Sequence, residues 1–186
     1  MAFSSSEGKL LFKDWLIHIA KPLGFKRFLD VGCGAGLYGD LIREVFQGEA
    51  TIHAMEIFVE YIGRYSLSNK YDSIFMDDIR KTYFVVENYD FIVAGDVLEH
   101  LSKEDAIEVV NGLRKKCKFL FGALPVKVNR PWSIGYNQLE SEWQENPYNQ
   151  HLHNWTGEEI HEAFKPLWLV PFIQTGAFLV EGSIQC

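Results

Sequence analysis

The chain has 186 residues, a net charge of −7 and an isoelectric point of about 5.4. This length suits one domain with one hydrophobic core, so we expect a single domain over residues 1–186. The balance of 47% hydrophobic and 23% charged residues is typical of globular proteins. An acidic chain without a basic tract is poorly suited to bind phosphate backbones, which makes a nucleic acid an unlikely partner.

The cysteines and the N-terminal residues bear on the cellular compartment. Cys33, Cys117 and Cys186 are odd in number and have no metal-ligand spacing, which favours a reduced protein. Residues 1–9 lack the basic-then-apolar pattern of a signal peptide. No apolar run approaches the roughly 20 residues that a membrane span requires. We therefore expect a cytoplasmic protein that does not enter a membrane.

Helix and strand patterns alternate along the chain. This order predicts an α/β fold: a Rossmann-like, doubly wound and mostly parallel sheet with helices on both faces. Two late strand patterns flank a turn at Thr175-Gly176 and predict a closing hairpin that adds an antiparallel strand. The expected helices are 9–20, 37–46, 58–66, one from the Ser102 cap to about 117, and one capped by Thr156 with Glu159. The expected strands are 27–31, 50–55, 73–76, 90–94, 118–124, 167–174 and 177–180.

The segment 126–155 shows no clear periodicity and is longer than an ordinary connection in a compact domain. Such segments are commonly functional, and we expect a substrate loop or lid here.

A glycine cluster follows the first predicted strand, in the run Asp30-Val31-Gly32-Cys33-Gly34-Ala35-Gly36. Glycines permit positive φ and a close approach of ligand to backbone, and the helix start that follows offers free amides. The run therefore predicts a nucleotide-like ligand at the carboxyl edge of the sheet. Leu37 stands where the dinucleotide fingerprint has its last glycine, and Asp30 would repel a pyrophosphate but suit an amino-acid ammonium. These details favour S-adenosylmethionine over NAD.

This run resembles the first motif of the class I S-adenosylmethionine-dependent methyltransferases, and the resemblance extends strongly over about 25–125. It implies that Glu56 binds both ribose hydroxyls. It also implies that the Asp78 carboxylate and the Ile79 amide bind the adenine. The segment 89–101 is similar to the fourth-strand motif, which would place Gly95 and Asp96 beside the methionine moiety. The implied cofactor is S-adenosyl-L-methionine, with these binding residues: Asp30, Gly32, Cys33, Gly34, Gly36, Glu56, Asp78, Ile79, Gly95 and Asp96.

Three histidines are candidate catalytic bases, because an unperturbed imidazole can accept a proton at neutral pH. His100 follows the fourth strand, near the expected methyl donor, although it could instead pack beneath the next helix. His151 and His153 would share one side of an extended chain and converge on one point. No third ligand with suitable spacing accompanies them, so we expect no metal. A similar histidine-rich stretch before Trp155-Thr156 occurs in many small-molecule members of the family, which suggests a lid over the donor.

The sequence thus predicts an enzyme that methylates a small-molecule acceptor, with oxygen as a candidate atom. Three alternatives remain: a catalytically inactive cofactor-binding module that serves a partner protein, an RNA or protein methyltransferase, and a nucleotide-dependent oxidoreductase. Asn146-Pro147-Tyr148 is similar to the N-P-P-Y motif of amino-methylating enzymes, but it lacks the second proline and follows the fifth strand. This difference disfavours amino methylation of DNA.

Overall fold

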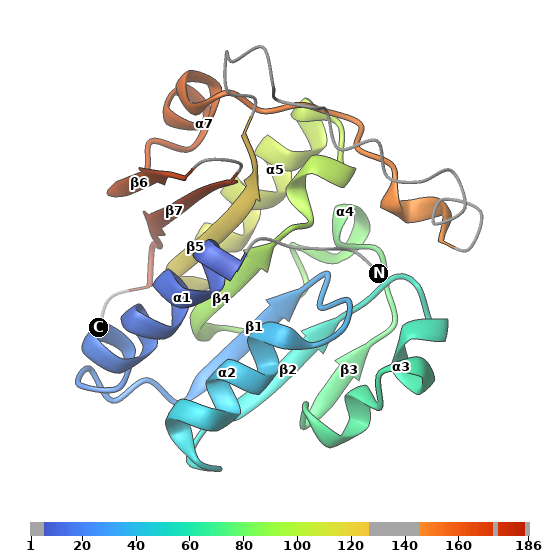
Figure 1. Cartoon of the computed structure of the whole chain (residues 1–186), viewed down its shortest axis with the longest axis vertical. Helices are drawn as coiled ribbons and strands as arrows, with labels where there is room; N and C mark the ends of the chain where they lie inside the picture. Colours follow the sequence, from blue (N-terminus) through green and yellow to red (C-terminus); the bar gives the residue numbers. More distant parts are fainter. Residues whose placement is uncertain (1–5, 127–145, 173–174, 185–186) are drawn as a thin grey trace.

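The computed structural model describes residues 6–126, 146–172 and 175–184. Its strands form one seven-stranded sheet in the order β3-β2-β1-β4-β5-β7-β6 (Figure 1). Neighbouring strands pair in parallel from β3 to β5, while β7 runs antiparallel between β5 and β6. The strands are β1 (Arg27–Val31), β2 (Thr51–Met55), β3 (Ser73–Phe75), β4 (Tyr89–Gly95), β5 (Cys117–Pro125), β6 (Trp168–Pro171) and β7 (Thr175–Glu181).

Helices cover both faces of the sheet, because alternate strand residues point to opposite sides. On β1, Phe28 packs into a core with α1, α2 and α3, whereas Leu29 packs into a second core with α4, α5 and α7. In Figure 1, α1 and α2 lie in front of the sheet and α5 lies behind it. The helices are α1 (Ser6–Trp15), the π-helix η1 (Leu16–Ala20), α2 (Leu37–Phe46), α3 (Glu60–Arg64), α4 (Ile79–Thr82), α5 (Lys103–Arg114) and α7 (Gly157–Phe164), with short 3-10 helices η2 (Leu67–Asn69), η3 (Leu98–His100) and η4 (Pro147–Asn149).

The predicted fold class is confirmed, including the antiparallel hairpin at the end of the chain. Thr156 and Glu159 form the expected capping box at the start of α7. The turn predicted at Thr175-Gly176 is wrong, since both residues begin β7 and pair with Pro125 and Leu124. Gly176 serves close packing there: a Cβ on it would lie 2.5 Å from Cγ2 of Val126.

Most of the predicted substrate loop, residues 127–145, lies outside the described residues. Its two ends come together, because Val126 forms a parallel bridge with Trp155, whose side chain is fully buried. Among the helices that the structure describes, none is long and apolar enough to cross a membrane.

Candidate functional site

The glycine turn joins β1 to α2 and brings the chain close to the segment after β4. Gly32 has φ +65°, and a Cβ placed on it would lie 2.4 Å from a methyl carbon of Val97. Gly36, with φ +74°, is the N-cap residue of α2. Both positions have a left-handed backbone conformation, which glycine adopts without steric cost, and this explains why glycine occupies them. Cys33 is buried within the turn, and burial raises the pKa of its thiol far above the ordinary value.

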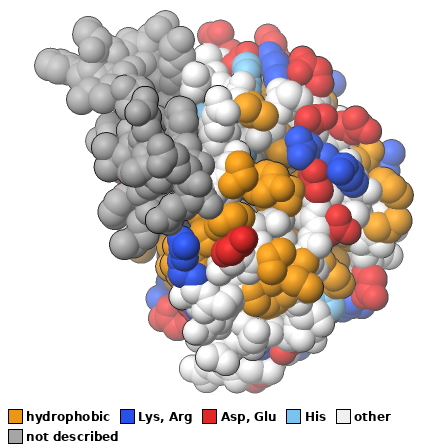
Figure 2. All heavy atoms as spheres, turned by 90° about the vertical axis from the view of Figure 1, so that its right-hand side faces the viewer, with side chains coloured by type: hydrophobic (Ala, Val, Ile, Leu, Met, Phe, Trp, Pro, Cys, Tyr) orange, Lys and Arg blue, Asp and Glu red, His pale blue; other side chains and the backbone are white. Residues whose placement is uncertain are grey.

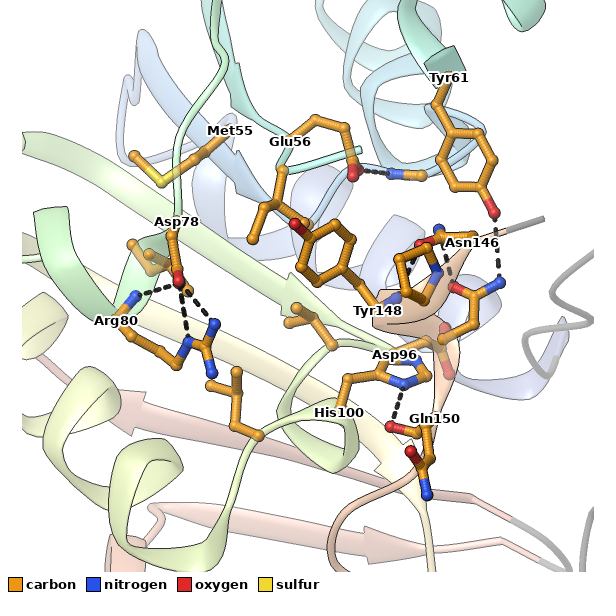
Figure 3. Close-up of a pocket in the computed structure, with 18 of the residues that line it drawn as sticks. Met55, Glu56, Tyr61, Asp78, Arg80, Asp96, His100, Asn146, Tyr148 and Gln150 are labelled. Atoms are coloured by element: carbon orange, nitrogen blue, oxygen red, sulfur yellow. Dashed lines mark hydrogen bonds and ion pairs between the residues drawn. The ribbon is translucent and has the colours of Figure 1, made fainter. Parts of the chain in front are cut away.

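Glu56 follows β2 and fixes the shape of this turn. Its Oε2 accepts a hydrogen bond from the backbone N–H of Gly34 at 2.9 Å, and its Oε1 accepts one from Phe58 at 2.8 Å. Burial raises the pKa of the Glu56 carboxyl, and these two hydrogen bonds act in the opposite direction. The same side chain lines the pocket described below (Figure 3). Glu56 can therefore hold the turn and present a carboxylate to a ligand.

Asp30 lies differently from the expectation. Its side chain is fully buried, and its Oδ2 accepts a hydrogen bond from the hydroxyl of Tyr71 at 2.5 Å. Burial raises the pKa of the Asp30 carboxyl to about 7, while the Tyr71 hydrogen bond acts against this rise. Asp30 is not among the residues that line the pocket. The structure therefore places Asp30 beneath the glycine turn and not in the pocket wall, where the sequence predicts a contact with an ammonium group.

A pocket of about 340 Å³ lies where the carboxyl ends of the parallel strands meet (Figure 3). Its volume falls in the range of small-molecule and cofactor sites. The predicted site residues that line it are Gly32, Gly34, Glu56, Asp78, Ile79, Asp96 and His100.

Asp78 follows β3 and is the N-cap residue of α4. Its Oδ1 accepts a hydrogen bond from the backbone N–H of Arg80 at 3.0 Å, and its Oδ2 pairs with the Arg80 guanidinium at 2.6 Å. The side-chain hydrogen bond from Arg80 holds the pKa of Asp78 below its ordinary value. The resemblance implies that the Asp78 carboxylate binds the adenine. The structure places Asp78 in the pocket wall, and its carboxylate also caps α4 and pairs with Arg80.

The end of β4 approaches the pocket through Gly95 and Asp96. Gly95 packs closely against the ring of Tyr38, where a Cβ would lie 2.2 Å from a ring carbon, and it does not line the pocket. Asp96 does line the pocket and has φ +55°, a left-handed conformation that is uncommon outside glycine. Its Oδ2 lies 3.5 Å from Nζ of Lys9 in α1. A strained residue of this kind at a pocket edge is typical of functional sites.

The three candidate histidines separate into two groups. His100 lines the pocket, and its Nδ1 lies 3.2 Å from the carbonyl oxygen of Gln150 (Figure 3). Burial, together with the neighbouring His151, lowers the pKa of His100 to about 4. The rings of His100 and His151 have centroids 4.9 Å apart. His100 therefore faces the pocket as a neutral imidazole, with His151 next to it.

The predicted convergence of His151 and His153 is wrong. The Nε2 of His153 lies 3.4 Å from Oε2 of Glu159 in α7, and its ring packs on that of Trp155 with centroids 4.9 Å apart. The backbone N–H groups of Leu152 and His153 both donate to the carbonyl oxygen of Glu99, at 2.8 and 3.3 Å. This anchoring leaves His151 beside His100, whereas His153 faces α7.

The sequence offered no third ligand for a metal, but the structure supplies a candidate. Glu99, the neighbour of His100 in η3, brings a carboxylate oxygen to within 4.8 Å of a ring nitrogen of both His100 and His151. The spacing along the sequence does not indicate this group, because His151 lies about 50 residues beyond Glu99 and His100.

The sequence did not identify several further pocket residues. Tyr61 of α3 accepts a hydrogen bond on its hydroxyl from Nδ2 of Asn149 at 3.2 Å, which links η4 to the pocket wall. The ring of Tyr148 lies across the middle of the pocket in Figure 3, and Arg80 lies at one side. Asn146 caps η4 by accepting from the N–H of Tyr148. The Asn146-Pro147-Tyr148 run was visible in the sequence, but nothing in the run placed it over this pocket.

Hydrophobic side chains gather on the face shown in Figure 2, among acidic and basic groups. This face is the right-hand side of Figure 1, which carries β3, α3 and η4. Exposed apolar residues on these and adjoining segments include Val59, Phe75, Met76 and Tyr148. A pocket bordered by apolar surface suits a ligand that is itself partly apolar.

Comparisons with known proteins identify the family of this chain and proteins with a similar fold. A family profile described as a methyltransferase domain matches residues 7–166. No significant match is found among curated proteins.

The fold is similar to those of several solved methyltransferase structures. Magnesium protoporphyrin IX methyltransferase from Synechocystis PCC 6803, with bound SAH, is 15% identical, with a TM-score of 0.64 over 95% of this chain and 84% of that one. TehB from Haemophilus influenzae is 14% identical, with a TM-score of 0.67 over 98% of this chain and 64% of that one. Mitomycin 7-O-methyltransferase MmcR is 13% identical, with a TM-score of 0.64 over 96% of this chain and 55% of that one. The profile match spans most of the chain, so the protein belongs to the methyltransferase-domain family, which confirms the predicted resemblance to class I S-adenosylmethionine-dependent methyltransferases.

Proposed function

We propose that this protein transfers a methyl group from S-adenosylmethionine to an oxygen atom of a small, partly apolar acceptor. The observation that carries the proposal is a single pocket with the glycine turn and Glu56 in one part of its wall and the neutral His100 in another. Similar folds in a mitomycin 7-O-methyltransferase and a magnesium protoporphyrin methyltransferase are consistent with this class of acceptor.

The residues of the pocket suit the cofactor. The Glu56 carboxylate can accept hydrogen bonds from ribose hydroxyls, while Met55 and Ile79 offer apolar contact for an adenine ring. With Asp30 buried, Asp96 is the carboxylate at the end of β4 that lines the pocket, and it suits an ammonium group. When bound, the cofactor supplies a methyl group on a positively charged sulfur. The acidic pocket wall stabilises that positive charge and aligns it, which is most of what an in-line transfer requires of the protein.

His100 is the side chain best placed to orient the acceptor. Its pKa of about 4 keeps the ring neutral at physiological pH, so it can accept a hydrogen bond from an acceptor hydroxyl. The same low pKa makes it a weaker base than an ordinary histidine. We therefore expect acceptors whose hydroxyl ionises readily, such as phenols or carboxylic acids. The apolar Leu101 and Leu152 and the ring of Tyr148 are suited to exclude water around such a molecule.

Calorimetric titration with S-adenosylmethionine and S-adenosylhomocysteine tests the cofactor part of the proposal. Glu56→Gln should weaken binding about 10- to 100-fold, because a hydrogen bond to a charged group contributes about 1.5–3 kcal/mol. Glu159→Gln is the matched control, since Glu159 lies on α7 and does not line the pocket. Equal affinities in native protein and Glu56→Gln would show that the pocket is misassigned.

A panel of phenols and carboxylic acids, analysed by mass spectrometry for the gain of one methyl group, tests the acceptor class. His100→Ala should reduce turnover at unchanged cofactor affinity, whereas His153→Ala should leave turnover near the native value. Methylation confined to amines or thiols would contradict oxygen as the acceptor atom. Cofactor binding without turnover of any acceptor would favour a binding module without catalysis.

A further inference from the structure

Three metal-ligating side chains meet at the edge of the pocket, from two segments that lie far apart in the sequence. Glu99 and His100 belong to η3, and His151 follows η4. One ligand atom from each lies within 4.8 Å of the others. In a tetrahedral site, ligand bonds of about 2.0–2.2 Å place each pair of donor atoms about 3.4 Å apart. An approach of at most about 1.4 Å between any two of these ligand atoms would therefore close the three groups around an ion.

The carboxylate of Glu99 is the strongest indication that a cation binds here. The residue is only 2% exposed, and its Oε2 has no hydrogen-bond partner within the part of the chain that the structure describes. Buried carboxylate oxygens are almost always paired, because leaving one unpaired costs the full desolvation of the group. A cation held between the Glu99 carboxylate and the two histidines would supply a partner for this buried group.

The surroundings of the histidines also have the form of a metal site. The Nδ1 of His100 lies 3.2 Å from the carbonyl oxygen of Gln150, and a proton on Nδ1 would leave Nε2 as the ligand atom. Such a contact to a backbone carbonyl is the usual way in which proteins orient a ligating histidine. The hydrogen bonds from the backbone N–H groups of Leu152 and His153 to the carbonyl of Glu99 hold the segment that carries His151 against η3.

We propose that Glu99, His100 and His151 bind a divalent transition-metal ion at the edge of the pocket. Two imidazoles and one carboxylate suit first-row ions such as Zn²⁺ and Co²⁺. Three protein ligands leave a coordination position open, which is the arrangement of catalytic sites and not of structural ones. His100 lines the pocket, so the open position can face an acceptor there.

The use of this ion in catalysis rests on the proposed function, whereas its binding does not. A hydroxyl oxygen bound to the ion would lose its proton to water more readily, because the metal lowers the pKa of the hydroxyl. That oxygen would then form its bond to the methyl carbon, while the carbon–sulfur bond breaks and its electron pair stays on sulfur. With the ion bound, Nε2 of His100 would be a metal ligand, so the acceptor hydroxyl would bind the ion in place of its hydrogen bond to His100.

Metal binding is tested on the chelator-treated protein without cofactor or acceptor, by calorimetry with Zn²⁺ and by visible absorption with Co²⁺. We expect one ion per chain, with each of His151→Ala and Glu99→Gln weakening binding at least about 10-fold. His153→Ala is the matched control: it removes a histidine two positions away that faces Glu159, and it should bind like the native protein. Circular dichroism during heating identifies any variant that fails to fold, and the conservative Glu99→Gln keeps the test open if His151→Ala is lost.

Two results would overturn the proposal: absence of binding by the native protein, or equal losses in His153→Ala and His151→Ala. Titration of S-adenosylhomocysteine into native protein and His151→Ala is measured separately, and both should bind it equally. Failure of that titration alone would count against the proposed methyl transfer and leave the metal site standing. Metal dependence of the initial rate, abolished in His151→Ala but retained in His153→Ala, would connect the two.

Discussion

Replacing Asp30 by asparagine would remove a carboxyl group that is fully buried beneath the glycine turn. In the folded chain, burial raises the pKa of this carboxyl to about 7, against an ordinary value of 3.8. The folded state therefore binds the proton more tightly than the unfolded state. The stability linked to this group is fully present below pH 3.8 and is lost as the pH rises through about 7.

The size of the effect follows from the difference between the two pKa values. At about 1.4 kcal/mol per pH unit, the full loss amounts to about 4 kcal/mol. About 2.5 kcal/mol of this loss falls between about pH 5 and about pH 8. Asparagine carries no charge, and its side-chain oxygen can still accept the hydrogen bond from Tyr71. We expect the free energy of unfolding of Asp30→Asn, relative to the native protein, to rise by about this amount across that interval.

Urea denaturation followed by tryptophan fluorescence, repeated at several pH values, measures this difference. Asp72→Asn provides the control. Burial acts to raise the pKa of Asp72, but hydrogen bonds from Ile52 and Arg43 outweigh it and hold the pKa below its ordinary value. Its contribution is therefore lost only in acid, and its effect should be constant from about pH 5 to about pH 8. Parallel curves for native protein and Asp30→Asn would refute the argument that Asp30 is protonated in the folded state near neutral pH.

Three further substitutions test other parts of the structure. Gly32→Ala should lower the free energy of unfolding, measured in urea, by about 1–3 kcal/mol, because it combines a positive φ with a clash against Val97. Adding Val97→Ala should restore part of this loss, and no restoration would mean that the clash is unimportant. Trp155→Ala should lower the free energy of unfolding by about 3–5 kcal/mol in the same assay. Trp155→Phe should lower it less, since the buried indole N–H has no partner among the described residues. Equal losses in the two variants would contradict this reasoning. The pKa of Glu159 is lowered to about 2, mainly by the hydrogen bond from Lys103. The stability that the ionised Glu159 contributes is therefore fully present above pH 4.5 and is lost as the pH falls through about 2. Glu159→Gln should accordingly lower the melting temperature at neutral pH, and the difference from the native protein should shrink near pH 2; a difference independent of pH would count against this ion pair.

The order of the sheet and its binding edge could be predicted because both depend on local patterns. The strand β1 and the helix α2 lie at the predicted bounds, since an apolar run, a glycine turn and an amphipathic helix follow one another there. The hairpin turn was misplaced for the opposite reason. The sequence predicts a turn at Gly176, but the small size of this residue serves contact with Val126, a neighbour that only the folded chain supplies.

The identity of the pocket residues was harder to predict, because a position at the end of a strand does not fix where its side chain points. Asp30 and Glu56 both follow the expected pattern, yet only Glu56 lines the pocket. Tyr71 lies about 40 residues beyond Asp30 and donates to its carboxylate under the turn, which turns a predicted ligand-binding group into a buried one. Asp78 does line the pocket, but its carboxylate pairs with Arg80, a contact that depends on the short helix α4, which the sequence pattern does not indicate.

The positions of His151 and His153 depend on one backbone contact that the sequence pattern does not indicate. Periodicity places His151 and His153 on one side of an extended chain, and that rule would make them equivalent. The carbonyl of Glu99 instead receives the N–H groups of Leu152 and His153. Because the same residue also brings its buried carboxylate toward His100 and His151, the contact that separates the two histidines also assembles the proposed metal site. Loss of metal in His151→Ala but not in His153→Ala would therefore test the two consequences of this contact together.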